Sequence, residues 1–310
     1  MSAARFIAGD WGTSHLRLAL CDEAGRVLAE AAGPGAAACR DRFAEVFARR
    51  TAHWSDQGPL PALLCGMAGS RQGWTEAPYL RCPVGLDDIV SGSIAVSAQG
   101  PRIMPGLMCT NPLGVADFLR GEETQLLGAL VLDAGLREGR HLVVLPGTHS
   151  KWLELADGQV QHFQTQVTGE LYAALHRHSV LATPATAAAD ESPLDGAFLL
   201  GLARAEASPG SLLAQLFECR SRRLAGDLPE SDASAFLSGL LIGHELAHGL
   251  ALLAAGPQTS LCLIGAPVLT RRYAYALNAL GIDAYSIDGS QAAIAGLTAA
   301  WRKINAEKSR

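Results

Sequence analysis

The stretch FIAGDWGTSHLRLALCDEAGRVLAEAA, residues 6–32, has the pattern of a three-stranded meander. An apolar run leads into a tight turn at Gly12-Thr13, and a second strand with alternating apolar residues follows. Glycine admits the backbone conformations that tight turns need, and alternation with period two is typical of a half-buried strand. A second turn between Asp22 and Gly25 starts the third strand. The segment therefore predicts strands joined by two short turns.

A second stretch, HLVVLPGTHSKWLELADGQVQHFQTQ at residues 141–166, repeats this order. Its first turn carries Gly147-Thr148, and its second turn again pairs Asp with Gly. Two such meanders, each followed by helical sequence, favour a duplicated protein; the alternative is chance similarity, because strand–glycine–strand hairpins are common. We expect one half at residues 1–135 and the other at residues 136–310.

Strand-like and helix-like segments alternate through the rest of the chain. Buried strands are predicted at residues 60–70 and 261–268, where apolar runs lead into loops with glycine. Helices are predicted from apolar spacing and capping residues at residues 40–55, 120–135, 231–256, 270–281 and 290–304. Alternation of this kind is typical of an α/β fold.

Composition argues against several classes of protein. Of the 310 residues, 49% are hydrophobic and 18% are charged, and the formal net charge is −5. We find no basic run, and nucleic-acid binding needs clustered positive charge, so no nucleic-acid partner is expected. No apolar run reaches the roughly 18 residues of a membrane span, and strand-like sequence begins at once, which argues against a signal peptide. Seven scattered cysteines without a C-x-x-C spacing favour reduced thiols in the cytoplasm.

The two Gly-Thr turns carry groups that suit a polyphosphate. In the first turn, the carboxylate of Asp10 precedes Gly12, Thr13 and Ser14. Amides and hydroxyls bind phosphate oxygens, and an acid can hold hydrated Mg²⁺. The second turn has no acid, but it offers amides, hydroxyls, an imidazole and an ammonium from Gly147, Thr148, His149 and Lys151. A single turn of this kind is more often a plain β-turn, whereas the pair predicts a nucleotide site.

The paired turns resemble the phosphate-binding hairpins of the actin-like ATPase superfamily, which includes sugar kinases, hexokinase and heat-shock ATPases. Within it, the chain is similar to the 2-dehydro-3-deoxygalactonokinase family over most of its length. The similar segments are CGMAGSRQGWTEAPYLRCP (65–83), RGEETQ (120–125), LPGTHSKW (145–152), TGELYAALHRHSVL (168–181), FLSGLLIGHELA (236–247) and LIGAPVLTRRYAYAL (263–277). The Gly-Met-x-Gly-Ser-x-x-Gly-Trp block is specific. The first turn departs from the expected pattern at Ser14-His15, which leaves Asp10 and Thr13 intact.

The resemblance implies two duplicated actin-like (ribonuclease H-like) ATPase domains around a nucleotide cleft, the first with the substrate pocket. It implies a kinase that transfers the γ-phosphate of ATP to the 6-hydroxyl of 2-dehydro-3-deoxy-D-galactonate, in galactonate catabolism. Catalysis then needs positioning, Mg²⁺ and a base near the attacking hydroxyl. Asp10 is the expected carboxylate for hydrated Mg²⁺. Glu123 is the first candidate for the base, followed by Glu122 and then Asp10; the alternative is that both glutamates only complement a helix dipole.

The resemblance also implies that residues 65–83 form the substrate pocket, where glycines would let a ligand approach the backbone and polar side chains could bind a 2-oxo acid. The residues assigned to it are Gly66, Met67, Gly69, Ser70, Arg71, Trp74 and Arg81. Arg71 or Arg81 would pair with the carboxylate of the substrate. Trp74 would line the pocket or join the core.

The resemblance also implies an adenosine-binding turn at Gly265-Ala266, at the end of a predicted strand. Small residues recur every four positions along the helix at residues 231–256, and Gly239 and Gly243 are among them. Such a stripe permits close helix packing or close approach of a nucleotide base. Both glycines are therefore assigned to the nucleotide. Thr168-Gly169-Glu170 stays open between a helix cap and a ligand contact.

The sequence HELAH at residues 244–248 fits H-E-x-x-H, in which two histidines bind zinc and the glutamate activates water. A zinc site needs a third protein ligand, and the extended motif lacks its later Gly and His because Ala251 and Ala254 stand there. A zinc hydrolase is therefore a remote alternative. A kinase for another sugar or sugar acid and a non-catalytic nucleotide-binding module are two further hypotheses. The oligomeric state is open, and a homodimer is one of its options.

Overall fold

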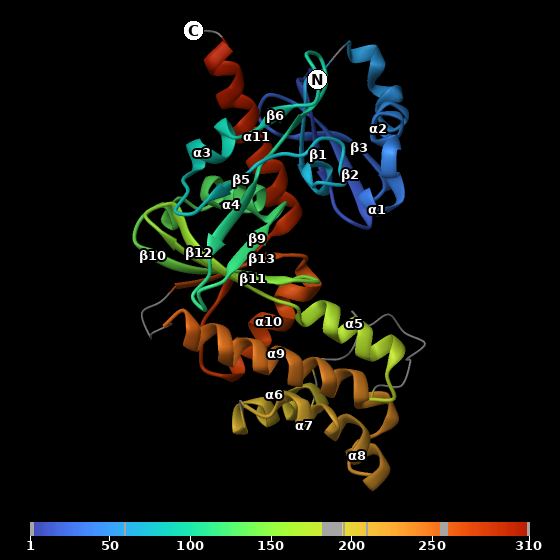
Figure 1. Ribbon diagram of the computed structural model, residues 1–310, viewed down its shortest axis with the longest axis vertical. Helices are drawn as coiled ribbons and strands as arrows, with labels where there is room; N and C mark the ends of the chain where they lie inside the picture. The colour runs from blue at the N-terminus through green and yellow to red at the C-terminus, as the bar shows by residue number, and fades with distance from the viewer. Residues whose placement is uncertain are drawn as a thin grey trace. The chain divides into compact units, whose positions relative to one another are not determined.

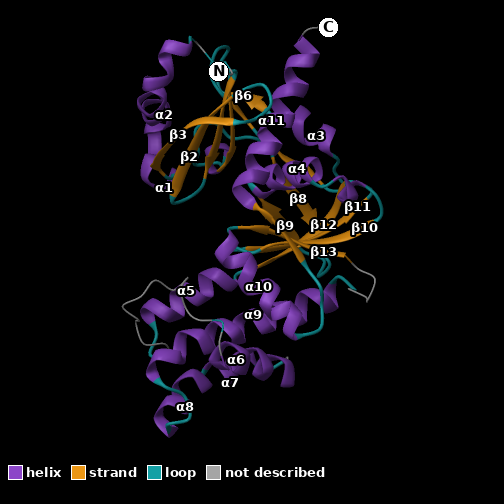
Figure 2. Ribbon diagram, turned by 180° about the vertical axis from the view of Figure 1, so that it is seen from behind, coloured by secondary structure: helices purple, strands orange, loops and turns teal. Residues whose placement is uncertain are grey.

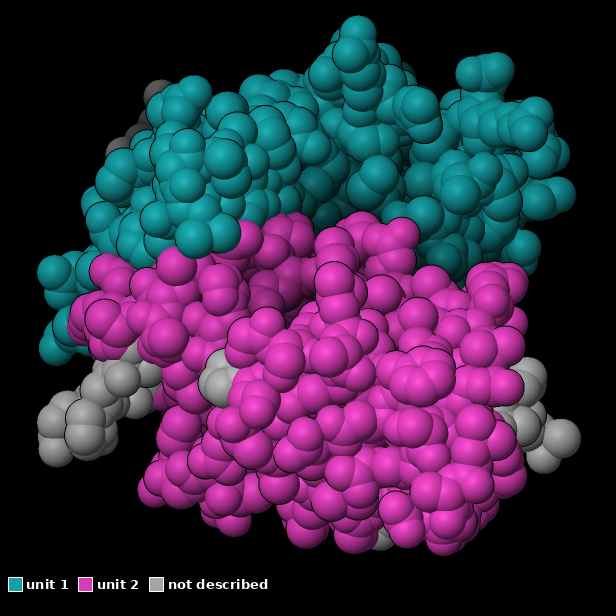
Figure 3. Space-filling model, turned by 60° about the horizontal axis from the view of Figure 1, so that its bottom comes forward, with its two compact units in different colours: residues 1–139, 155–162, 289–310 teal, residues 140–154, 163–288 magenta. Residues whose placement is uncertain are grey.

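The structure, a computed structural model, describes residues 3–58, 60–181, 194, 196–208, 210–254 and 260–308. It divides into two compact units, which Figure 3 colours separately. Unit 1 comprises Met1–Gly139, Leu155–His162 and Gly289–Arg310, and unit 2 comprises Arg140–Glu154 and Phe163–Asp288. This differs from a single division after residue 135, because the C-terminal segment returns to unit 1.

A six-stranded sheet in unit 1 holds the first meander (Figure 1). Its strand order is β3-β2-β1-β4-β7-β6. β1 pairs antiparallel with β2 and parallel with β4, so β1 lies inside the sheet and is mostly buried. The strands span Phe6–Trp11 (β1), His15–Cys21 (β2), Val27–Pro34 (β3), Ala62–Gly66 (β4), Ile94–Ala95 (β6) and Arg102–Ile103 (β7).

A five-stranded sheet holds the second meander and repeats this order as β12-β11-β10-β13-β14. β13 pairs parallel with β10, as β4 does with β1. The strands span Arg140–Leu145 (β10), Ser150–Ala156 (β11), Gln159–Gln166 (β12), Ser260–Gly265 (β13) and Tyr285–Asp288 (β14). The repeated order confirms the predicted α/β fold with duplicated halves.

The remaining elements of unit 1 include a small sheet, ordered β5-β8-β9, with strands Tyr79–Arg81 (β5), Gly106–Thr110 (β8) and Ala116–Leu119 (β9). The helices are Ala36–Cys39 (α1), Phe43–Thr51 (α2), Leu86–Ser91 (α3), Glu122–Leu132 (α4) and Gly289–Lys308 (α11). α11 packs closely on α4 because glycines lie where the helices cross. A side chain on Gly128 would overlap the backbone of Ala292, and one on Gly296 would overlap the backbone of Thr124.

Most of unit 2 beyond its sheet is helical, as Figure 2 shows in purple. The helices span Thr168–His178 (α5), Gly196–Ala207 (α6), Leu212–Leu216 (α7), Glu218–Ala225 (α8), Ala233–Leu252 (α9) and Pro267–Ala279 (α10). α9 packs against the other five. It lies within the predicted helix at residues 231–256, whose expected end at Gly256 is outside the described residues.

The stretch Glu230–Leu252 is long and apolar enough to span a membrane by length and composition alone. However, 67% of its most apolar window is buried inside the protein. Phe236, Leu237 and Leu240 are fully buried in a cluster with residues of α6 and β10. The apolar character of α9 is therefore explained by its position at the centre of the unit 2 core.

Candidate functional site

Asp10 lies near the end of β1, between two neighbouring strands. Arg17 of β2 is its antiparallel partner, and Cys65 of β4 is its parallel partner. Arg17 Nη1 lies 3.7 Å from Asp10 Oδ2, and Cys65 Sγ lies 3.9 Å from Asp10 Oδ1. Neither contact is short enough to occupy the carboxylate fully. The side chain is 30% exposed, while burial of the remainder raises the pKa of Asp10 and Arg17 opposes that rise.

Backbone amides at the start of α1 hold the turn after β1. They belong to Gly35, which precedes α1, and to the first two residues of the helix. The backbone N–H groups of residues 35–37 donate to the carbonyl oxygens of Ser14, Gly12 and Thr13, at 3.1, 3.0 and 3.2 Å. The C=O and N–H of a trans peptide point in opposite directions, so the amides that follow Gly12 and Thr13 point away from α1. Gly35 is needed here, because a side chain on it would overlap the Thr13 carbonyl. The turn thus presents amides on its free side.

Two glutamates open α4 in different surroundings. Glu123 is fully buried; its Oε2 accepts a hydrogen bond from the Gly121 amide at 2.6 Å, and its Oε1 accepts one from the Thr124 hydroxyl at 2.9 Å. Burial, helped by the Glu122 charge, raises the pKa of Glu123 to about 7. Glu122 is only partly buried, and its Oε2 accepts from the Arg120 amide at 3.1 Å. A carboxyl that titrates near neutral pH suits proton transfer.

Cys65 lies between these glutamates and Asp10. Burial raises the pKa of the Cys65 thiol well above its ordinary value, and the charges of Asp10 and Glu123 raise it further, so both acids lie near it. A Cβ on Gly121 would be 3.4 Å from Gly66 Cα, and a Cβ on Gly66 would be 3.4 Å from Asp10 Oδ1. The three predicted catalytic acids, Asp10, Glu122 and Glu123, therefore gather around the end of β4.

The second turn, in unit 2, repeats the arrangement of the first. The Glu170 amide at the start of α5 donates to the Thr148 carbonyl at 2.9 Å. A side chain on Gly169 would overlap the Gly147 carbonyl, so Gly169 corresponds to Gly35 of the first half. His149 Nε2 lies 2.5 Å from Glu170 Oε2. The open segment Thr168-Gly169-Glu170 is thus the start of a helix that holds this turn.

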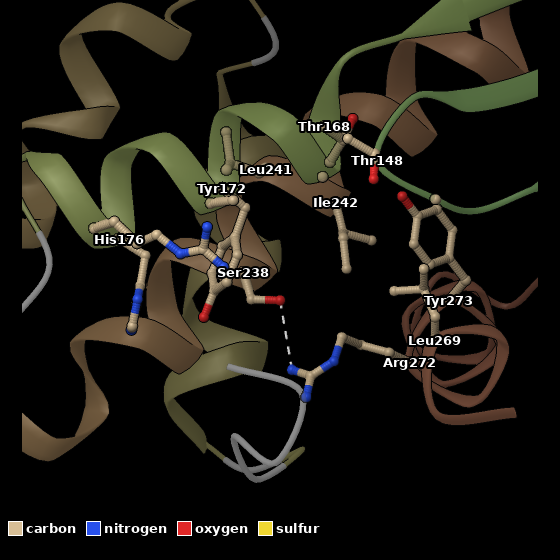
Figure 4. A pocket seen from close by; sticks show the side chains of 14 residues that line it. Thr148, Thr168, Tyr172, His176, Ser238, Leu241, Ile242, Leu269, Arg272 and Tyr273 are labelled. Carbon is tan, nitrogen blue, oxygen red and sulfur yellow. Dashed lines mark hydrogen bonds between the residues drawn. The ribbon is translucent and has the colours of Figure 1, made fainter. Parts of the chain in front are cut away.

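A cavity of about 470 Å³ lies beside the second turn, between α5, α9 and α10. Figure 4 shows the hydroxyl groups of Thr148, Thr168 and Tyr273 at one end and the side chains of Tyr172 and His176 toward the other. The rings of Tyr172 and His176 stack, with centroids 5.6 Å apart and an interplanar angle of 21°. The apolar side chains along the cavity are Leu241, Ile242 and Leu269. A flat apolar group with a polar end would fit this lining.

The predicted adenosine turn lies next to the second phosphate turn. Gly265 ends β13, and a Cβ on it would be 3.4 Å from the carbonyl oxygen of Pro146. Ala266 is exposed and precedes α10, whose Tyr273 reaches the cavity. The second turn, the adenosine turn and the cavity are therefore parts of one region of unit 2.

Residues 10–300 match the family described as 2-keto-3-deoxy-galactonokinase. The chain belongs to this family. It is 39% identical over 307 residues to the probable 2-dehydro-3-deoxygalactonokinase DgoK1 of Rhizobium meliloti (strain 1021), with 98% of both chains covered. It is 36% identical over 295 residues to the 2-dehydro-3-deoxygalactonokinase of Escherichia coli (strain K12), which covers 95% of this chain and 96% of that protein.

Solved structures agree with this family assignment. A crystal structure from Sinorhizobium meliloti, of a protein provisionally assigned as a 2-dehydro-3-deoxygalactonokinase, has a TM-score of 0.86 and 39% identity and covers 96% of this chain and 99% of its own. A second solved structure is component A of (R)-2-hydroxyglutaryl-CoA dehydratase from Acidaminococcus fermentans, with 11% identity and a TM-score of 0.51. The match covers 96% of this chain and 98% of that chain, and at this identity it shows the fold alone. The alternative of a zinc hydrolase finds no support in these matches.

In this galactonokinase-family chain, the predicted substrate residues lie between the end of β4 and the end of β5. β4 ends at Gly66, which has a φ of 83°, and a short 3₁₀ helix at Met67–Gly69 follows. Ser70 is partly buried, whereas Arg71 and Arg81 are exposed. The loop after β4 therefore starts beside the acid cluster and carries Arg71, whereas Arg81 ends β5; both side chains are exposed at the surface of unit 1.

Trp74 packs against the aromatic core of unit 1. Its ring centroid lies 6.2 Å from that of Trp11 and 5.6 Å from that of Phe47. Of the two roles left open for Trp74, lining the pocket or joining the core, the structure favours the core.

Sequence analysis missed Arg120, which joins the substrate loop to the start of α4. Its Nη2 donates to the Ala77 carbonyl at 2.8 Å, and its Nε donates to the Tyr79 hydroxyl at 3.3 Å. The guanidinium also lies 4.2 Å above the Tyr79 ring, and a Cβ on Gly69 would be 2.7 Å from Nη1. The available signal was its place directly before Gly121 and the two glutamates.

Three residues assigned to the nucleotide have other contacts in the structure. A side chain on Gly239 would overlap the Phe198 carbonyl of α6, and a Cβ on Gly243 would be 2.7 Å from Ala205 Cβ. The small-residue stripe therefore allows α9 and α6 to pack closely, and we leave both glycines out of the nucleotide site. Lys151 is only 5% exposed, and its Nζ donates to the Thr165 hydroxyl at 2.8 Å. Its ammonium is thus bound to β12.

The HELAH segment of α9 is divided between two environments. His248 is exposed, and His244 Nε2 lies 2.6 Å from Gln215 Oε1. Glu245 is 2% exposed and points into the core. Within the described ranges, no three His, Cys, Asp or Glu residues form a group suited to a metal ion. Glu245 therefore lies in the interior of unit 2, where Trp152 and Tyr273 donate hydrogen bonds to it.

Proposed function

We propose that this protein is a cytoplasmic kinase that transfers the γ-phosphate of ATP to the 6-hydroxyl of 2-dehydro-3-deoxy-D-galactonate. The family match over residues 10–300 carries the proposal. The two relatives named as 2-dehydro-3-deoxygalactonokinases, each covered almost completely, support the substrate class. A kinase for another sugar acid is the alternative within the same chemistry.

Asp10 is the residue proposed to hold hydrated Mg²⁺. Its carboxylate is partly exposed, has only long contacts with Arg17 and Cys65, and precedes a turn with outward amides. These properties fit a hard cation that keeps most of its waters. Bound Mg²⁺ would neutralise charge on the phosphates during transfer.

The base is proposed among the glutamates at the start of α4. Glu123 remains the first candidate, because its pKa of about 7 matches neutral pH and general bases work best near the working pH. Glu122 is the second candidate, because its carboxylate is the one that reaches the surface. In the reaction, the base would accept the proton of the 6-hydroxyl while the hydroxyl oxygen forms a bond to the γ-phosphorus. The bond between the γ-phosphorus and the β–γ bridging oxygen breaks, and ADP leaves. Glu123→Gln and Glu122→Gln, compared for kcat, separate the two.

Each Gly-Thr turn is proposed as a phosphate-binding element of its own unit. The outward amides at Thr13 and Ser14 support phosphate binding in unit 1, and Gly147-Thr148 offers a matching turn in unit 2. The cavity beside the second turn supports binding of the adenosine, because Leu241, Ile242 and Leu269 give it an apolar part, Ser238 and Arg272 add polar groups, and the end nearest Thr148 carries hydroxyls.

An ADP-release assay across a panel of 2-keto-3-deoxy sugar acids, with ATP and Mg²⁺, tests the proposal. We expect the highest kcat/KM with 2-dehydro-3-deoxy-D-galactonate. A higher kcat/KM for another acid would make that acid the substrate in place of 2-dehydro-3-deoxy-D-galactonate. ATP binding without turnover of any acid in the panel would favour a non-catalytic nucleotide-binding module.

A further inference from the structure

Glu245 of the HELAH segment is the centre of a buried hydrogen-bond network in unit 2. Its Oε1 accepts from the indole Nε1 of Trp152 at 2.8 Å, and its Oε2 accepts from the Tyr273 hydroxyl at 2.7 Å. The Tyr273 oxygen also lies 3.2 Å from Ser150 Oγ. Trp152 and Tyr273 are no more than 2% exposed, so water cannot replace these partners easily.

The partners of Glu245 all act as donors toward it. An indole N–H can only donate, the Tyr273 hydroxyl donates to Oε2, and the nearby hydroxyls of Thr168 and Ser150 also lower the pKa of the carboxyl. Burial raises the pKa of Glu245, and these donors oppose the rise because they stabilise the ionised form. A carboxyl group, with acceptor sites on both oxygens, therefore suits this set of donors.

These donors come from the elements that surround the second turn. Ser150 begins β11 directly after the turn, and Trp152 follows on the same strand. Thr168 begins α5, which holds the Thr148 carbonyl through Glu170. Tyr273 lies on α10. Glu245 thus joins α9 to three elements around the second turn, and two of its partners, Thr168 and Tyr273, line the 470 Å³ cavity (Figure 4).

We propose that Glu245 is a positioning residue for nucleotide binding, which holds the second turn and the hydroxyls of Thr168 and Tyr273 in the geometry that receives ATP. The inference rests on the proposed use of ATP. It gives the HELAH segment a role that needs the glutamate and neither histidine. A catalytic zinc site would instead need both histidines together with the glutamate.

Glu245→Gln tests this role with little change in volume. The glutamine amide places an NH₂ group where one carboxylate oxygen accepted hydrogen bonds. A hydroxyl that donated to that oxygen must then rotate to accept from the NH₂ group, or it loses its hydrogen bond. We expect KM for ATP to rise about tenfold, which equals about 1.4 kcal/mol of binding, and KM for the sugar acid to change less than about threefold. Tyr273→Phe removes one donor and keeps the ring, and it should raise KM for ATP in the same direction.

His248→Ala is the matched control, because His248 belongs to the same segment and is exposed. We expect wild-type values of both KM parameters for this variant. An equal loss in His248→Ala and Glu245→Gln would overturn the inference. So would an unchanged KM for ATP in folded Glu245→Gln, or an equal rise in both KM values. If Glu245→Gln does not fold, Tyr273→Phe decides by the same two criteria. The wild-type enzyme tests the proposed function separately, since absence of ADP release there would remove the function and not only this role.

Discussion

Replacing the buried Glu123 by Gln should change how stability depends on pH. The carboxyl has a pKa of about 7 in the folded protein and an ordinary value of 4.5. Between these values the folded protein keeps a proton that the unfolded chain releases. The unfolded state then binds fewer protons, so stability falls as pH rises from about 4.5 to about 7. Above this range the folded protein carries the full penalty of an ionised, buried Glu123.

The size of the effect follows from the two pKa values. One pKa unit corresponds to about 1.4 kcal/mol, so ionised Glu123 lowers the free energy of unfolding by on the order of 3 kcal/mol at pH 8. Glutamine is neutral at every pH, and its oxygen can still accept from the Gly121 amide or the Thr124 hydroxyl. Relative to wild type, Glu123→Gln should therefore gain up to about 3 kcal/mol between pH 5 and pH 8.

Urea unfolding of both proteins at pH 5, 6, 7 and 8 measures this difference, because carboxyl groups distant from residue 123 contribute equally in the two proteins and cancel. Glu76→Gln is the control for the substitution itself, because Glu76 is exposed. A difference between Glu123→Gln and wild type that stays constant within about 0.5 kcal/mol across this range would refute the assignment of a raised pKa to Glu123.

Other substitutions test the remaining parts of the site. Asp10→Asn should lower kcat about 10²-fold or more in the ADP-release assay, and near wild-type turnover at saturating Mg²⁺ would rule out its proposed role. Gly35→Ala and Gly169→Ala should each raise KM for ATP about tenfold, since a methyl group would push each turn away from its helix, and an unchanged KM would contradict this. Gly243→Leu should lower the free energy of unfolding by about 3 kcal/mol or more, whereas His248→Ala should change it by less than about 0.5 kcal/mol; similar losses would contradict the α6–α9 packing.

The duplicated fold could be predicted from sequence because its signal is local. The Gly-Thr turns, with alternating apolar residues on either side, are visible within two stretches of fewer than thirty residues each. The strand orders around β1 and β10 confirmed that interpretation. The place of α11 could not be predicted in this way. It depends on the fit of Gly296 against Thr124, two residues that are far apart in the chain.

The site was harder to predict than the fold, because a residue pattern does not identify the contact that requires it. Gly239 and Gly243 indicated close approach, but the approaching group is α6. H-E-x-x-H drew attention to Glu245, while the surroundings that define its role come from β11, α5 and α10. The position of Arg120 directly before Gly121 was its one local signal, because its partners Ala77 and Tyr79 lie more than forty residues earlier.

The packing of α11 on α4 has a consequence for how the protein is made on the ribosome. The acids of α4 are synthesised well before residues 289–308, whose Ala292 and Gly296 cover its Gly128 face. Because domains emerge from the N-terminus at about 5–20 residues per second, α4 waits many seconds for this partner. All of unit 2 is translated during that interval. The Gly128 face of α4 therefore stays uncovered until the segment 289–308 has been translated.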